Sequence, residues 1–231
     1  IRKVAVILIK NNKDDISNKI SQYIKKQNIA KEYDKDYQEN HQKLIEWLIQ
    51  IYHTPMKSSD ISIYDVDEKK CIKEMSFLLG INDNFSIQKL NCILNNSGKN
   101  IFINDENSDF IYKYLKGEID LVYEHQGKFY IVDYKSNFVS EYLSDYHYKN
   151  LAYIMDTQGY WLQACIYQLA LHKLLKLRIK DYQGNEKRYL GAIEFVFLRG
   201  VDKEFHDSGR INWDIPIDLI YQLDGLFISK K

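Results

Sequence analysis

The chain has 231 residues, and its 32 basic and 32 acidic side chains leave no net charge at pH 7. This length can bury the core of one domain, or of one domain with an appendage, while the balanced charge argues against a free-standing nucleic-acid-binding protein. The three cysteines, Cys71, Cys92 and Cys165, form no Cys-X-X-Cys pair, which argues against a disulfide framework, a zinc site or a four-cysteine iron–sulfur cluster. Buried, reduced thiols in a cytoplasmic protein are expected instead.

The first 40 residues are the least informative part of the sequence. The apolar run at residues 4–9 predicts either a buried strand or a helix end, and it is too short to span a bilayer. Residues 16–24 place isoleucine at every fourth position, which is helical spacing. A helix is predicted over residues 41–52, with Pro55 just beyond it. A chain that starts with isoleucine is expected to be part of a longer protein.

The next segments predict a strand and then a loop. Residues 71–79 mix apolar side chains with Glu74 and are predicted to form a strand. Glu74 is expected to be a solvated charge, and the alternative is that it approaches the functional site. Residues 81–108 are rich in Asn, Asp and Ser around a short apolar segment, which predicts a loop or insertion.

Two apolar segments on either side of Gly127 predict a β-hairpin. If its loop is Gln126–Gly127, facing residues have numbers that sum to 253, so Asp120 faces Asp133. Lys135 then projects from the same face as Asp133. The alternatives are a metal site and an exposed hairpin with ordinary surface charges, and the apolar neighbours of both aspartates favour a metal site. Repulsion between opposed carboxylates also predicts that removing Asp133 leaves the fold intact or slightly more stable.

The second half of the chain predicts helices and a buried strand. Residues 160–177 are predicted to form a helix, residues 191–198 a buried strand, and residues 203–231 a tail that contains a final helix. His147 and His172 are expected at the surface or at an interface rather than as metal ligands.

Three blocks of the sequence resemble the nuclease domains of the RecB family, within the PD-(D/E)XK nuclease superfamily. They are residues 116–137, 160–173 and 197–202, in the right order and at similar separations. The resemblance is strong over about residues 110–202 and weaker over about residues 41–80. It implies an α/β fold with a restriction-endonuclease-like core, in which helices flank a mixed central sheet.

The resemblance also implies a division of the chain into four parts. These are a mainly helical N-terminal part at 1–80, a loop or insertion at 81–108, the PD-(D/E)XK nuclease core at 109–202, and a helical tail at 203–231.

The same resemblance assigns the site, which comprises Asp120, Asp133, the backbone carbonyl of Tyr134, Lys135, Gln163 and Tyr167. The aspartates and the carbonyl would hold Mg²⁺, which prefers hard oxygen ligands. The lysine would orient or deprotonate the attacking water, or offset charge on the phosphate. The glutamine and tyrosine match the family's Gln-X-X-X-Tyr motif on one helix face, and they would hold the DNA backbone or orient the lysine.

One departure from the family pattern leaves two functions open. The family has a further metal ligand, a histidine in a Gly-X-X-X-His helix, which this sequence lacks, and His41 is the nearest substitute. The first function is an exodeoxyribonuclease of the exonuclease V type, acting in the cytoplasm on single strands from unwound duplex during DNA repair and recombination. It would work with RecC-like and RecD-like subunits, and neutral charge suits a module that receives its substrate from such partners. The second is a docking module with a decayed site. The tyrosines of residues 138–158 would either stack on single-stranded DNA or pack in the core.

Overall fold

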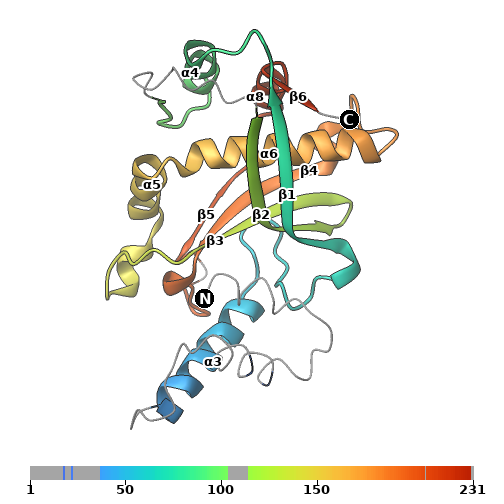
Figure 1. Ribbon diagram of the computed structural model, residues 1–231. Coiled ribbons are helices and arrows are strands. Elements are labelled where there is room, and N and C mark those ends of the chain that lie inside the picture. Colours follow the sequence, from blue (N-terminus) through green and yellow to red (C-terminus); the bar gives the residue numbers. More distant parts are fainter. Residues whose placement is uncertain (1–17, 19–21, 23–36, 104–113, 206, 230–231) are drawn as a thin grey trace.

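The fold is built on one six-stranded mixed sheet (Figure 1). The computed structural model describes residues 37–103, 114–205 and 207–229, together with positions 18 and 22. The strands are β1 (Cys71–Ile81), β2 (Tyr114–His125), β3 (Lys128–Lys135), β4 (Leu190–Phe197), β5 (Arg210–Trp213) and β6 (Phe227–Ser229). They lie in the order β5-β4-β3-β2-β1-β6, and only the β3–β4 pair is parallel among them. The predicted α/β class with a mixed sheet is confirmed.

Helices pack on both faces of this sheet. They are α3 (Tyr37–His53), α4 (Ile87–Asn95), α5 (Tyr148–Thr157), α6 (Tyr160–Arg178), α7 (Glu186–Tyr189) and α8 (Ile217–Asp224), with 3-10 turns η2 (Glu68–Lys70), η3 (Leu143–Tyr146) and η4 (Leu198–Gly200). The predicted helices at 41–52 and 160–177 correspond to α3 and α6. Figure 1 shows α6 running across the strands, so a single long helix spans the sheet that carries the predicted site.

The β2–β3 hairpin has the predicted register. Five pairs from His125–Lys128 to Leu121–Val132 all have numbers that sum to 253. The loop residues Gln126 and Gly127 have φ angles of 51° and 80°, as a two-residue hairpin loop with left-handed residues requires. The sequence of the loop therefore sets which side chains of the two strands face each other.

Two apolar clusters cover the two faces of the sheet. The α6-side cluster includes Val122, Ile131, Ile193, Phe195 and Leu169. The α3-side cluster includes Leu121, Val132, Val196, Leu48 and Ile51. Neighbouring residues of each strand alternate between the two clusters, because successive side chains of a strand point to opposite faces. Asp120, Asp133 and Glu194 are charged side chains within these strands that are buried.

Strands β1 and β2 change face together near Glu74. Cys71 packs with the α3-side cluster, but Met75, four residues later, packs with the α6-side cluster. The facing strand β2 also changes face, because its Leu121 belongs to the α3-side cluster and its Ile119 to the α6-side cluster. Glu74 itself is exposed and has a φ of 49°, in the left-handed region. The ladder is thus distorted at the point where β2 carries the first predicted aspartate.

Three sequence predictions are corrected by the structure. Residues 81–108, predicted as a loop or insertion, are not a loop throughout, because they contain α4, whose Leu90 and Leu94 are buried in the α6-side cluster. The tail does contain the predicted helix, as α8, but strands β5 and β6 lie on either side of it in the chain. Cys92 is exposed rather than buried.

Other predictions fall outside the described residues, namely those for 4–9, for the isoleucines at 16, 20 and 24, and for 109–113. His147 is exposed, as predicted. Within the described part of the chain, every helix is too short or too polar to cross a membrane.

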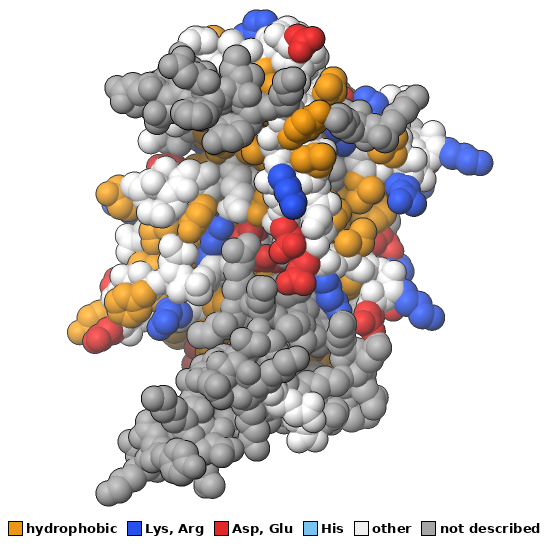
Figure 2. Space-filling model, in the orientation of Figure 1, with side chains coloured by type: hydrophobic (Ala, Val, Ile, Leu, Met, Phe, Trp, Pro, Cys, Tyr) orange, Lys and Arg blue, Asp and Glu red, His pale blue; other side chains and the backbone are white. Residues whose placement is uncertain are grey.

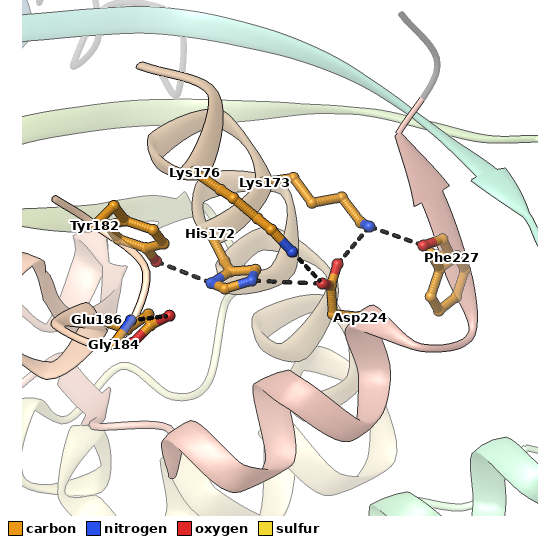
Figure 3. Close-up of polar contacts among 8 residues, drawn as sticks. All are labelled: His172, Lys173, Lys176, Tyr182, Gly184, Glu186, Asp224 and Phe227. Carbon is orange, nitrogen blue, oxygen red and sulfur yellow. Dashed lines mark hydrogen bonds and ion pairs between the residues drawn. The ribbon is translucent and has the colours of Figure 1, made fainter. Parts of the chain in front are cut away.

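A polar cluster joins α6 to the end of α8 (Figure 3). Asp224 accepts hydrogen bonds from Lys173 and Lys176, at 2.5 and 3.2 Å. His172 Nδ1 lies 2.9 Å from the hydroxyl oxygen of Tyr182, whereas its Nε2 is 3.7 Å from Asp224 Oδ2, too far for a hydrogen bond. Only 2% of His172 is exposed, so the first of its two predicted locations, the surface, is wrong. The cluster fixes the C-terminal helix on the sheet-covering helix.

Candidate functional site

The predicted site lies where strands β2 and β3 separate. Their ladder ends at the pair Leu121–Val132, while β2 continues alongside β1. Asp120 is the next residue of β2, and its Oδ2 accepts a 2.9 Å hydrogen bond from the backbone N–H of Tyr134. This bond holds the carboxylate against β3, beside the peptide that follows Asp133.

The charged groups at this point are buried. Exposure is 5% for Asp120, 0% for Asp133 and 6% for Lys135. Lys135 Nζ lies 2.8 Å from Asp133 Oδ2, so β3 carries an ion pair between residues of the same face. Burial raises the pKa of the neighbouring Tyr134 phenol, and the negative charge of Asp120 raises it further. Two carboxylates and one ammonium are thus gathered in a buried site, where charged groups are stabilised by pairing or by a bound cation.

Helix α6 encloses the ammonium group of Lys135. Its Nζ donates a 2.7 Å hydrogen bond to Gln163 Oε1 and lies 3.6 Å from the centroid of the Tyr160 ring. The Tyr160 ring stacks on Phe195 of β4, with centroids 6.0 Å apart. An aromatic face at this distance attracts a cation. Tyr160 was not among the residues predicted for the site, although its position three residues before Gln163 places the two on the same face of a helix.

A chain of hydrogen bonds links this helix back to β2. Gln163 Nε2 donates to the hydroxyl oxygen of Tyr167, and the Tyr167 hydroxyl donates to the backbone carbonyl of Glu118, each over 2.7 Å. The Phe77 ring packs edge-on against the Tyr167 ring, with centroids 5.8 Å apart. A Cβ at Gly117 would lie only 2.4 Å from the Phe77 ring, so glycine makes room for this ring. The structure therefore brings the predicted glutamine and tyrosine to the predicted lysine.

The donor groups at the site suit a hard divalent cation. Asp120 and Asp133 provide carboxylate oxygens, which are the ligands that Mg²⁺ prefers. No three of the His, Cys, Asp and Glu side chains in the described ranges gather in a metal-binding arrangement, so the set is small. A metal role for the Tyr134 carbonyl stays a prediction. Glu74 is exposed, in line with a solvated charge, and His41 belongs to α3.

Known proteins similar to this chain are nucleases of one superfamily and RecB subunits. A family model described as the PD-(D/E)XK nuclease superfamily matches residues 25–198. The chain is 37% identical over 190 residues to the RecBCD enzyme subunit RecB of Haemophilus influenzae, covering 80% of this chain and 15% of that protein. For the Escherichia coli subunit the identity is 32% over 186 residues, covering 80% and 16%. For that of Mycobacterium tuberculosis it is 34% over 120 residues, covering 49% and 11%. The chain thus spans about 15% of the length of the first two relatives.

Proposed function

Because this chain belongs to the PD-(D/E)XK nuclease superfamily, as a RecB-like nuclease domain, we propose that it cleaves phosphodiester bonds of DNA in a Mg²⁺-dependent reaction. The observation that carries this proposal is the buried ion pair between Lys135 and Asp133, with Asp120 held against the same strand. Buried carboxylates beside a lysine suit a cation site, and buried charges with a specific charge partner accompany functional sites.

Each residue of the site would have a distinct task. Asp120 and Asp133, with the Tyr134 carbonyl, would hold the cation. When bound, Mg²⁺ would polarise the scissile phosphate and lower the pKa of a coordinated water. Lys135 would hold that water in line with the phosphorus, or compensate the charge that develops on the phosphate oxygens. Gln163 would keep the ammonium of Lys135 aimed at the reacting atoms.

The substrate and partners belong to the same proposal. We propose that the domain acts as an exodeoxyribonuclease on single strands unwound by a helicase, with RecC-like and RecD-like subunits, in cytoplasmic DNA repair and recombination. Figure 2 shows acidic side chains gathered near the centre of one face, with basic side chains beside them. With zero net charge as well, such a surface favours delivery of DNA by partner subunits over capture from solution.

A digestion assay tests this function. Linear single-stranded and duplex DNA would be incubated with the chain over a range of Mg²⁺ concentrations, with and without partner helicase subunits. We expect cleavage that a chelator abolishes and that Lys135→Met and Asp133→Asn each reduce by at least about 100-fold. The matched control Glu74→Gln, which changes an exposed acid on the neighbouring strand, should cleave at the parental rate. Undiminished cleavage by Lys135→Met would place the chemistry elsewhere.

A docking function is the second candidate, and one observation of the sequence favours it. No glycine in the 231 residues is followed four positions later by histidine, so the further ligand of the family is not among them. A chain that binds partner subunits but shows no metal-dependent cleavage in any combination would support this alternative.

A further inference from the structure

A groove lies directly beyond the catalytic strand. It has a volume of about 600 Å³, and its lining includes Leu44 and Trp47 of α3, Phe138 and Glu141 of the loop after β3, Tyr146 of η3, and Arg199 of η4. We refer to it as the Phe138–Arg199 groove. The site described above uses none of these side chains.

The groove is continuous with the site through both neighbouring strands. Lys135 and Phe197 form the last pair of the parallel β3–β4 ladder. Phe138 follows that pair by three residues along one strand, and Arg199 follows it by two along the other. A hydrogen bond connects the two regions, because the Tyr160 hydroxyl donates to Asn137 Oδ1 over 3.3 Å. The ring that covers the Lys135 ammonium therefore also holds the entrance of the groove.

The floor of the groove is fixed before any ligand arrives. Tyr146 is only 2% exposed, and its hydroxyl oxygen accepts a 3.1 Å hydrogen bond from the backbone N–H of Val139. Its backbone carbonyl accepts another from Gly209 N, at 2.9 Å. A Cβ at Gly200 would lie 2.3 Å from the Tyr146 ring, so only glycine allows this close packing.

The α3 wall of the groove is held by two buried charges. Glu194 accepts hydrogen bonds from the backbone N–H groups of Lys57 and Ser58, at 3.0 and 2.9 Å. Arg210 donates to the backbone carbonyl of Pro55. These bonds attach the segment after α3 to strands β4 and β5. Less loss of conformational entropy is therefore required when a ligand binds between α3 and the loop.

The chemistry of the walls suits an unstacked base beside a phosphate. Phe138 is 63% exposed, and Arg199 Cζ lies 5.7 Å from the centroid of its ring. Tyr142, between lining residues of the loop, is 70% exposed. Aromatic faces stack on any base, and a guanidinium binds phosphate oxygens. Stacked bases of a duplex do not offer their faces, so these walls select single strands.

We propose that the Phe138–Arg199 groove binds the single strand of DNA next to the scissile phosphate, with a base on Phe138 and the phosphate backbone along Arg199. This inference rests on the proposed nuclease function, and it adds the path of the strand. Glu141, on the groove wall, keeps the backbone on the side of Arg199 by repulsion.

A binding experiment without catalysis tests the groove. Labelled oligothymidine would be titrated into the full chain in the presence of a chelator, with fluorescence anisotropy as the readout. Phe138→Ala and Arg199→Ala should each weaken binding by about 5-fold or more, as expected for losing one stacking or phosphate contact. Phe102→Ala is the matched control, because this phenylalanine is 74% exposed but does not line the groove.

Tryptophan fluorescence gives a second readout at the groove itself. Of the three tryptophans, Trp161 and Trp213 are buried, at 2% and 8% exposure, whereas Trp47 is partly exposed and lines the groove. Oligothymidine should quench the emission of the parent chain, and Trp47→Phe should remove most of that quenching.

The outcomes separate the groove from the nuclease function. Cleavage by the parent together with unchanged oligothymidine binding by both groove variants overturns the groove but leaves the nuclease. Groove-dependent binding without any cleavage supports the groove and overturns the nuclease. The groove is overturned as a DNA site if the parent does not bind oligothymidine. It is also overturned if Phe138→Ala weakens the binding of a helicase subunit but leaves the binding of DNA unchanged.

Discussion

The ammonium of Lys135 and the amide of Gln163 are joined by a 2.7 Å hydrogen bond from Nζ to Oε1. The orientation of that amide is set from the other side, because Gln163 Nε2 donates to Tyr167, which donates to a backbone carbonyl. A rotated amide would place its N–H groups against an ammonium, which has no acceptor. Helix α6 therefore determines where the lysine of β3 points.

Tyr167→Phe tests this positioning role. The change removes the acceptor of the Gln163 N–H group and one donor to the Glu118 carbonyl, so Lys135 loses its fixed direction. We expect kcat to fall about 10- to 100-fold with KM little changed, and the free energy of unfolding to fall by roughly 1–2 kcal/mol. Steady-state cleavage kinetics and urea unfolding measure the two effects. Tyr153→Phe on α5, at a 69% exposed position, is the control. A change confined to KM would contradict a positioning role.

Repulsion between the opposed carboxylates alone predicts that Asp133→Ala is as stable as the parent or slightly more stable, but the ion pair with Lys135 predicts a lower stability. Lys135 is 6% exposed and paired with Asp133 at 2.8 Å, so removing the carboxylate leaves a buried ammonium with a weaker set of partners. We expect a loss of roughly 1–3 kcal/mol in a chelator, rather than a gain, moderated because Gln163 still accepts from the lysine. Urea unfolding measures it, and Lys135→Met in the same variant should restore part of the loss. A variant more stable than the parent would favour the repulsion argument.

The sequence predicted the hairpin and its register because the determinants are local. Gly127 supplies the left-handed turn, and the alternating strands on either side make one register favourable. From that register followed the proximity of Asp120 to β3 and the shared face of Asp133 and Lys135. The helix that carries Gln163 was equally visible from its apolar pattern.

The features that the sequence did not reveal depend on distant contacts. Strand β6 has only three residues, and it exists because β1, far earlier in the chain, offers its edge. His172 is buried because α8 covers a helix that is apolar on most sides, so no polar face marks where solvent ends. The left-handed conformation of Glu74 has no local cause, since glutamate does not favour it.

The Asp224 cluster predicts a stability that depends on pH. Burial alone would raise the pKa of Asp224, but its contacts with His172, Lys173 and Lys176 outweigh burial and hold that pKa well below its usual value. A lowered folded-state pKa means that the carboxylate stabilises the fold above its unfolded pKa of about 3.9, and that this contribution is lost as the pH falls toward the folded value.

At pH 7 the free energy of unfolding of Asp224→Asn should therefore be lower than that of the parent by roughly 1–3 kcal/mol, so the variant unfolds at a lower urea concentration. The difference should narrow steadily below about pH 4, as the parent carboxyl becomes protonated. Asp218→Asn, on the first turn of the same helix, controls for general charge effects. A difference that stays constant from pH 7 to pH 3 would mean that the pairing of Asp224 with the lysines contributes nothing.

The cation site itself can be tested without any cleavage. If Asp120 and Asp133 hold Mg²⁺ with few other protein ligands, the affinity should be weak, because each missing ligand lowers it by at least about 10- to 100-fold. For a Kd of about 1 mM, 10 mM Mg²⁺ stabilises the folded state by about 1.4 kcal/mol, which raises Tm by about 3–5 °C for a chain of this size.

Asp120→Asn keeps a carbonyl oxygen to accept from Tyr134 N, so the fold should survive while the Mg²⁺-dependent rise in Tm disappears. Glu74→Gln, on the adjacent strand, should keep the full rise. Scanning calorimetry of the three chains with Mg²⁺ and with chelator measures this, and an equal rise in Asp120→Asn would show that the cation binds elsewhere.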